Sequence, residues 1–376
     1  MTHSSSTTEA PNARVHLGGG AITTTQAAWT ELLSKVTRPA YFQFPEVHQR
    51  YLDQLGAPDS LVVIELLRGQ RCVGIIAAER ARARLAGMNF DSLALPYHPH
   101  FILSDAVLAD GEKLVDFWPS IGTALAQSSL RWEALRFPCA LAGGAALTAA
   151  SDLEPLAFER RLRASNYFDC TGPYEQISAR YTDLLKKNLQ KGWKRIERTG
   201  AFEVKSVRGG EEGLWAFDEF LRIEGSGWKG QQGSSIAADP KLAQFWKELF
   251  LLQSAGLYAE INLMMLDGAA IAGQFCVVSG RTAYVHKIAY DEAHKRLSPG
   301  HLFIEYLLKK SCADPQIDIV SVVSGAAWHA DWAPIARDVH EVWLFRRGWQ
   351  ARLVRLAVSL IARIRRIKQR GQQPGA

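Results

Sequence analysis

Three consecutive strand-like segments joined by tight turns constrain the fold of this chain more than any other feature. The segments and their turn dipeptides follow one another as 258–266, Asp267-Gly268, 269–280, Gly280-Arg281 and 281–291. Short turns that contain glycine typically join neighbouring antiparallel strands. The pattern therefore predicts an antiparallel meander in the second half of the chain.

A basic loop and an apolar helix follow the last of these strands. The run from Tyr284 to Leu308 reads as a strand, a loop closed by Ser298-Pro299-Gly300, and a helix start. The first N–H groups of a helix lack internal partners, and the helix dipole is positive at that end. Lys295 and Arg296 add positive charge there. The sequence therefore predicts an anion site, although proline and glycine before a helix are also common without any ligand.

Composition indicates a globular chain with room for two domains. The chain has 376 residues, of which 47% are hydrophobic and 22% charged. Its five cysteines are scattered and form no CxxC pair, so we expect neither a disulfide framework nor a metal site. The first residues are polar and resemble no secretory signal, and no apolar run reaches the roughly 20 residues that a membrane span needs. We therefore expect residues 1–20 to be a disordered tail and the protein to be cytoplasmic.

The two halves of the chain share a rhythm of helices, a hairpin, a further helix and a strand. In the first half, residues 26–36 and 45–55 read as helices and residues 61–80 as a hairpin. In the second half, a basic helix over 179–198 and two further helices precede the meander. The first half has no counterpart of the Ser-Pro-Gly loop, so any duplication would be an old one.

Short motifs in the second half resemble those of GNAT-fold acyltransferases of the CelD-like family, which are distantly related to Fem-type aminoacyltransferases. The motifs are G-x-x-I-A, Y-x-x-K-x-x-Y-D and S-P-G, here at Gly268, Ile271, Ala272, Tyr284, Lys287, Tyr290, Asp291, Ser298, Pro299 and Gly300. An upstream tryptophan–lysine segment also matches, at Glu224, Trp228, Lys229 and Ser235. The resemblance covers roughly residues 178–335 and is weak in the first half.

The resemblance implies an α/β fold of tandem GNAT-like domains, each a mixed, mostly antiparallel sheet flanked by helices. The domains that it implies are a tail at 1–20, a degenerate GNAT-like domain at 21–165, a GNAT acyltransferase domain at 166–345 and a basic amphipathic helix and tail at 346–376. In this family the loop after the fourth strand binds the pyrophosphate of acyl-CoA. The chain departs from the usual Q/R-x-x-G-x-G/A loop, because Pro299 stands where a more flexible residue is common.

Three groups of site residues follow from the motifs and from the chemistry of acyl transfer. Candidates for the general base, and thus for catalysis, are Glu224, His286 and Asp291. Candidates for binding the donor, acyl-CoA or acetyl-CoA, are Ile288, Ala289, Lys295, Arg296, Leu297, Ser298, Pro299, Gly300 and His301. Candidates for binding the acceptor are Trp228, Lys229, Ser235, Tyr284, Lys287 and Tyr290.

Strand alternation sets which of these side chains can meet. Regular alternation puts Tyr284 and His286 on one face and Lys287 on the other, unless a bulge intervenes, which we expect near Ile288. A lone strand histidine such as His286 is more often structural than catalytic. Glu224 ends its helix, where the dipole disfavours an acid, and this local conflict favours a functional role.

Basic segments raise the question of partners. The net charge is +6, but nine Lys and Arg and no acid lie beyond residue 345, so the rest of the chain sums to −3. The basic helix at 179–198 is either a solvated face or a surface for a phosphate-rich acceptor, an acyl carrier protein or, less favoured, a donor tRNA. Residues 349–370 show amphipathic helical periodicity, which favours either docking on the body or peripheral contact with the inner membrane surface.

The sequence thus predicts an N- or O-acyltransferase that moves an acyl group from acyl-CoA, or from an acyl carrier protein, to an amine or hydroxyl. The acceptor would be a small molecule, a saccharide or a peptide in polysaccharide, envelope or secondary-metabolite biosynthesis. Two alternatives stay open: aminoacyl transfer from tRNA, as in Fem-type enzymes, and a non-catalytic module that retains the GNAT fold.

Overall fold

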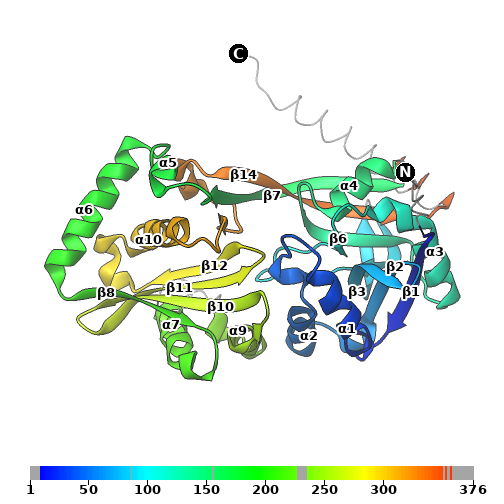
Figure 1. Cartoon of the computed structure of the whole chain (residues 1–376), viewed down its shortest axis with the longest axis horizontal. Helices are drawn as coiled ribbons and strands as arrows, with labels where there is room; N and C mark the ends of the chain where they lie inside the picture. Colours follow the sequence, from blue (N-terminus) through cyan, green and yellow to red (C-terminus); the bar gives the residue numbers. More distant parts are fainter. Residues whose placement is uncertain are drawn as a thin grey trace, which may run out of the picture. The chain divides into compact units, whose positions relative to one another are not determined.

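The protein divides into two compact units, both mixed α/β (Figure 1). The computed structural model describes residues 9–85, 87–154, 156–226 and 235–349, together with 352, 353, 356 and 357. The first unit takes the chain up to Val36, Ala57–Leu162 and the chain from Val339, and the second takes Thr37–Gly56 and Arg163–Asp338. Residues 37–56 lie in the first half of the sequence, but they pack in the second unit.

The first unit contains a mostly antiparallel sheet with helices. Its elements are β1 (Pro11–Leu17), α1 (Ala21–Leu33), β2 (Leu61–Arg68), β3 (Arg71–Leu85), β4 (Met88–Ala94), β5 (Val107–Leu108), α3 (Trp118–Gln127), β6 (Ala134–Leu141) and α4 (Ala145–Asp152). The strand order is β1-β2-β3-β4-β6, and Val339–Phe345 of β14 (Ile335–Phe345) pairs with β6. All these pairs are antiparallel except β4–β6, which is parallel over Ser92–Ala94.

The second unit has the same arrangement with a longer meander. Its helices are α2 (Pro45–Gln54), α5 (Tyr174–Ser178), α6 (Asp183–Thr199), α7 (Leu214–Ser226), α9 (Pro240–Leu251) and α10 (Pro299–Ala313). Its strands are β7 (Ala157–Asp169), β8 (Phe202–Arg208), β9 (Gln253–Ser254), β10 (Leu257–Leu266), β11 (Ala269–Ser279), β12 (Thr282–Tyr290) and β13 (Ile319–Ser321). They follow the order β7-β13-β12-β11-β10-β8, with β9 on β10, and only β12–β13 is parallel.

The predicted meander and fold class are confirmed. Strands β10, β11 and β12 match the three predicted segments within a residue or two. Asp267 and Gly268 have φ of 49° and 82°, and Gly280 and Arg281 have φ of 52° and 64°. Positive φ at both central residues defines the hairpin turn that suits the twist of the flanking strands, so these dipeptides set the register of the meander.

Helices cover both faces of the second sheet (Figure 1). On one face α7 and α9 pack through aromatic rings, with Phe275 of β11 about 5.0 Å from Trp246 and 6.0 Å from Phe220, centroid to centroid. On the other face α6 and α10 pack through aliphatic residues such as Leu189 and Leu302. The side chain of Thr182 accepts the Leu185 N–H and starts α6 as an N-cap.

Two local predictions are wrong. Residues 1–20 were expected to be a disordered tail, but Pro11–Leu17 forms β1, whose seven residues pair with β2. Its alternation of half-buried and exposed positions is too weak in sequence to suggest a strand, so the partner strand decides it. The sequence of residues 166–178 also reads as a connector between the two halves, but Tyr167–Asp169 pairs with β13 and belongs to β7. Among the described residues, no helix has the length and apolar character needed to cross a bilayer.

Candidate functional site

A β-bulge in β12 determines which side chains meet at the site. Cys276 of β11 lies opposite Val285, and the next residue back, Phe275, lies opposite Lys287, so His286 is the extra residue. The bulge was expected near Ile288 and lies two residues earlier. It turns both His286 and Lys287 toward the face covered by α7 and α9, so the regular alternation that would separate these two side chains does not hold here.

Lys287 meets Glu224, which projects from the last turn of α7. The Lys287 ammonium lies 3.8 Å from the Glu224 Oε1, and the two side chains are 15% and 1% exposed. Oε2 accepts the backbone N–H of Ile236 at 2.7 Å, whereas Oε1 is buried and has no hydrogen-bond partner in the described part of the chain. A buried carboxylate with one unused oxygen is costly unless a charge or a ligand compensates it. The pair therefore leaves a polar acceptor ready for a substrate group.

Glu224 also joins the two ends of the segment predicted to bind the acceptor. The segment leaves α7 at Ser226 and re-enters the described structure at Ser235, which is buried and precedes Ile236. Because the Ile236 N–H binds Glu224, the carboxylate sits where this segment begins and ends. Trp228 and Lys229, both predicted to contact the acceptor, lie outside the described residues.

Strands β12 and β13 pair over only three residues. The parallel pairing joins Thr282–Tyr284 to Ile319–Ser321, and among the described residues β12 then pairs only with β11 as far as Tyr290. A strand edge without a partner offers its N–H and C=O groups to a ligand. The bulge at His286 lies directly after the point where this pairing ends.

The predicted donor loop follows β12 as a 3₁₀ helix over Glu292–Leu297 and then α10. Asp291 caps the 3₁₀ helix, since its Oδ1 accepts the Ala293 N–H at 2.9 Å. Ser298 adopts a left-handed conformation with φ of 54°, and Pro299 is the first residue of α10. A Cβ at Gly300 would lie 3.8 Å from a ring atom of Tyr290 and 4.0 Å from Ile288, so this glycine faces the end of β12.

Positive charge surrounds this helix start. Lys295 and Arg296 are exposed, and the first turn of α10 contains no acidic residue. Arg195 of α6 donates to the backbone carbonyl of Arg296 and so fastens the basic helix to the loop. The N–H groups of His301 and Leu302 donate to the Ser298 carbonyl at 3.1 and 3.3 Å. The helix start thus has one fewer open N–H than the sequence suggested, and the two cations supply the remaining attraction for an anion.

The remaining predicted donor residues differ in how they can act. Three of them are buried: Leu297, Ala289 and Pro299. Ile288 and Tyr290 are half-buried and pack against the core of the second unit. His301 stacks on Trp328 with ring centroids 5.8 Å apart and planes 20° apart. Burial lowers the pKa of His301. Trp328 is 44% exposed beside the loop, and no sequence motif singled it out.

His286 and Tyr284 pack among aromatic rings. The ring of His286 lies 4.7 Å from that of Tyr41 and 5.2 Å from that of Trp246. Burial lowers the pKa of His286 to about 3 and raises that of Tyr284 to about 12. A histidine with so low a pKa is a weak base, and the packing favours a structural role. Asp291 is likewise engaged as a cap, which leaves Glu224 as the predicted base with an unused oxygen.

Comparisons with known proteins concern the fold of this region. Residues 185–332 match the family model described as an acetyltransferase (GNAT) domain, which spans less than half of the chain. Among the curated proteins, none matches the chain.

Several solved structures share the fold at low sequence identity. FemX has a TM-score of 0.57 at 10% identity, covering 88% of this chain and 98% of that one. The C-terminal domain of a protein described as a lysylphosphatidylglycerol synthetase, from Agrobacterium fabrum, has a TM-score of 0.55 at 12% identity, covering 90% and 97%. L-PGS from Bacillus licheniformis has a TM-score of 0.52 at 10% identity, covering 88% and 95%. Residues 185–332 therefore form a GNAT-fold acyltransferase domain.

Proposed function

We propose that the protein transfers an acyl group from a thioester donor to an amine or hydroxyl acceptor at the Glu224–Lys287 pair. The observation that carries this proposal is the buried, unused oxygen of Glu224, 3.8 Å from the Lys287 ammonium and beside the β12 bulge. The motifs in this region also support assignment to the CelD-like branch of GNAT-fold acyltransferases.

The proposed reaction needs one base and one stabilised oxyanion. The acceptor nitrogen or oxygen attacks the thioester carbonyl carbon while Glu224 takes its proton. The carbon–sulfur bond then breaks, and the sulfur leaves as a thiol after accepting the proton that Glu224 took, which regenerates the carboxylate. The Lys287 ammonium lies 3.8 Å from this carboxylate, and backbone N–H groups at the bulge would stabilise the developing negative charge on the carbonyl oxygen. Positioning of both reactants supplies much of the remaining acceleration.

We propose acyl-CoA or acetyl-CoA as the donor. Its pyrophosphate would lie against Lys295, Arg296 and the start of α10, with the thioester arm along the edge of β12 beyond Tyr284. Gly300 supports this placement, because it faces the end of β12, where a Cβ would lie 3.8 Å from a ring atom of Tyr290 and 4.0 Å from Ile288. This donor site needs no metal.

A carrier-borne donor is a second candidate because of α6. Lys187, Lys191, Lys194 and Arg198 of this helix are exposed, and Arg195 joins it to the donor loop. Any acidic carrier that presents a donor at the loop would therefore contact α6. An acyl carrier protein or an aminoacyl-tRNA fits that description, and the same experiment distinguishes them from free acyl-CoA.

Thermal shift of the full chain tests the donor. Coenzyme A, acetyl-CoA, a longer acyl-CoA, an acyl carrier protein and tRNA are added in turn, and a ligand of the folded state raises the melting temperature according to RT ln(1 + [L]/Kd). We expect a shift with the CoA compounds. A shift with tRNA alone would replace them by the aminoacyl alternative. No shift with any of them would favour the non-catalytic module.

We propose a cytoplasmic location with peripheral contact at the inner membrane surface through residues 349–370. Within the described residues, Trp349, Leu353 and Leu356 are 68%, 45% and 67% exposed, and Arg352 is exposed beside them. Exposed apolar side chains next to cations are typical of interfacial helices. Flotation with anionic liposomes compares the full chain with a chain that ends at Gly348, and equal failure of both to float would refute the contact.

A further inference from the structure

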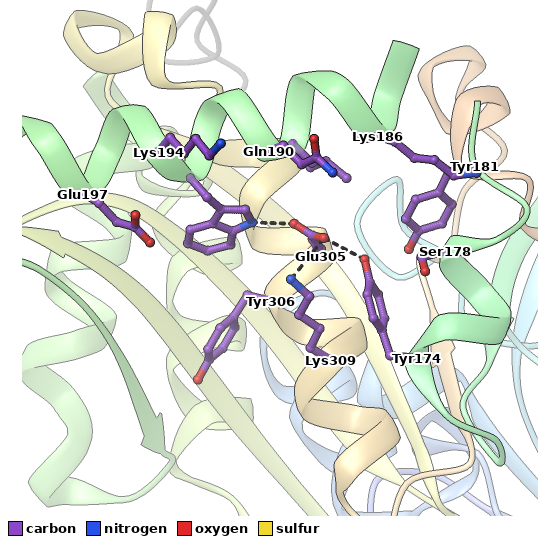
Figure 2. Close-up of a pocket in the computed structure, with 12 residues that line it drawn as sticks. Tyr174, Ser178, Tyr181, Lys186, Gln190, Lys194, Glu197, Glu305, Tyr306 and Lys309 are labelled. Carbon is purple, nitrogen blue, oxygen red and sulfur yellow. Dashed lines mark hydrogen bonds and ion pairs between the residues drawn. The ribbon is translucent and has the colours of Figure 1, made fainter. Parts of the chain in front are cut away.

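A groove on the second unit lies between α5, α6 and α10 (Figure 2). Its volume is about 750 Å³, within the range of roughly 300–1,000 Å³ typical of small-molecule sites. From α10 the groove takes Glu305, Tyr306 and Lys309, one to three turns beyond the helix start. Nothing from residues 284–301 lines it, so it is separate from the proposed donor site.

A buried carboxylate organises this groove. Glu305 is 7% exposed and accepts a hydrogen bond from the Tyr174 hydroxyl at 2.7 Å on Oε1. Its Oε2 accepts the indole N–H of Trp193, and the Lys309 ammonium lies 3.1 Å from Oε1 (Figure 2). Since both oxygens are engaged by three donors, Glu305 does not call for a cationic ligand. It instead fixes two aromatic rings and one ammonium in place.

Aromatic rings form the walls. Tyr174 and Trp193 each hydrogen-bond to one oxygen of Glu305, and Tyr306 also lines the groove. The Lys309 ammonium lies 5.2 Å from the ring centre of Tyr174 and 5.9 Å from that of Trp193. Hydrogen bonds at their edges thus hold both rings in place, and the ammonium lies over one face of each.

Hydrogen-bond donors and positive charge dominate the rest of the lining. Three lysines, Lys186, Lys194 and Lys309, face two glutamates, Glu197 and Glu305, which leaves a lining charge of +1. Lys186 is anchored at one end by a bond from its ammonium to the Ala179 carbonyl at 3.1 Å. Because Lys309 already neutralises Glu305, the attraction left over is for an anion.

We propose that this groove binds a small organic anion with a planar ring, an aromatic carboxylate or a ring-bearing phosphate. The ring would stack against the aromatic walls, and the anionic group would meet Lys194, whose charge Glu305 does not neutralise. This places a second ligand site on the unit, reached independently of the donor loop.

Titrations with minimal probes followed by ligand-observed NMR test the proposal. Phenyl phosphate carries both elements, cyclohexyl phosphate lacks the aromatic face, inorganic phosphate lacks the ring, and benzoate replaces phosphate by carboxylate. We expect phenyl phosphate or benzoate to bind about two- to tenfold more tightly than cyclohexyl phosphate, as ring stacking allows. The tighter of the two identifies the anionic group. Equal affinity of the aromatic and saturated phosphates, or no binding of either aromatic probe, would overturn the proposal.

Matched lysine variants locate the binding. Lys194→Gln removes a charge from the lining, and Lys187→Gln removes the same charge from an exposed position of α6 that does not line the groove. We expect the first to weaken phenyl phosphate about two- to fivefold and the second to leave it unchanged. Equal losses would assign the binding to the general charge of α6 and refute the groove. The titration is repeated with a variant in which Lys295 and Arg296 are both changed to Gln, and its affinity for phenyl phosphate should equal that of the wild type. A loss of affinity in this variant would mean that phenyl phosphate binds at the donor loop and not in the groove.

Discussion

The start of α4 in the first unit and the start of α10 in the second differ in what lies beside their N–H groups. In the first unit α4 begins after Gly144, and the buried carboxylate of Asp105 accepts the N–H groups of Ala106 at 2.8 Å and Ala146 at 3.1 Å. A Cβ at Gly144 would lie 2.0 Å from the Asp105 Oδ2, so only glycine leaves room for this carboxylate. The chain thereby supplies its own hydrogen-bond acceptor to the N-terminal end of α4.

In the second unit α10 begins at Ser298 with exposed Lys295 and Arg296 and no acid in its first turn. Nothing in the described chain takes the place that Asp105 takes in the first unit. A helix start filled from within stabilises the fold, whereas one flanked by cations and left open can bind an external anion. This difference between the two helix starts is the reason that we place the donor site in the second unit.

The sharpest test removes the proposed base from the second unit. Glu224→Gln keeps an oxygen for the Ile236 N–H but loses the ability to take a proton. We expect kcat to fall about 10²–10⁴-fold, with donor affinity retained, because general-base catalysis contributes that much. Steady-state kinetics and calorimetric titration of the donor measure the two quantities. Glu219→Gln on the same helix, an exposed acid paired with Arg222, is the control, and an unaltered kcat in Glu224→Gln would return this residue to a structural role.

A bulkier residue at Gly300 should close the open helix start. Gly300→Val places methyl groups toward Tyr290 and Ile288, where the donor arm is expected, and should weaken CoA binding about tenfold or more. The fold should survive, since a Cβ there makes only ordinary contacts. Gly122→Val in α3 of the first unit has open space around its Cβ and should leave CoA affinity unchanged. Unchanged affinity in Gly300→Val itself, measured by calorimetry, would contradict the loop assignment.

Neutralising the two exposed cations should have a smaller effect that depends on salt. We expect Lys295→Gln combined with Arg296→Gln to raise the KM for acyl-CoA about three- to tenfold at low ionic strength. The difference should shrink at high salt, because exposed charges are screened. The matched control, Lys113→Gln combined with Arg131→Gln, changes two exposed cations of the first unit. It should leave the KM for acyl-CoA unchanged at both low and high salt. A salt-independent effect would point to a lost structural contact.

The buried carboxyl of Asp105 should make the stability of the first unit depend on pH. Burial raises the pKa of Asp105 to about 7, so the folded state keeps its proton to higher pH than the unfolded chain does. The unfolded carboxyl ionises first, so the free energy of unfolding should fall as the pH rises from about 4 to about 7. Asp105→Asn still offers an oxygen to the Ala146 N–H but does not ionise, and should remove this slope.

Urea unfolding at pH 5 and pH 8 measures that effect. The midpoint of Asp105→Asn relative to wild type should be higher at pH 8 than at pH 5. The variant Asp59→Asn changes an exposed carboxyl of the same unit and should follow wild type at both values. The same offset at both pH values would mean that Asp105 does not hold its proton in the folded state.

Local chemistry made several elements predictable. The Asp267-Gly268 and Gly280-Arg281 turns, and Ser298-Pro299 before α10, lie where the sequence indicated them, since turn geometry and helix starts depend on a few neighbouring residues. Strand β1 and the extent of β7 were missed because each is decided by its partner strand. The groove around Glu305 was missed as well, since Tyr174, Trp193 and Glu305 come from three separate helices.

The sequence by itself determined the meander and the basic loop with its helix start. It also singled out Glu224 and Lys287 as candidate site residues, each on its own grounds. Only the tertiary structure decided that these two residues face each other, because one bulged residue, His286, reverses which face Lys287 takes. Strand alternation is a local rule, but a bulge depends on how a neighbouring strand pairs. The filling of one helix start by Asp105 and the opening of the other are likewise tertiary, since each depends on residues far away in the chain.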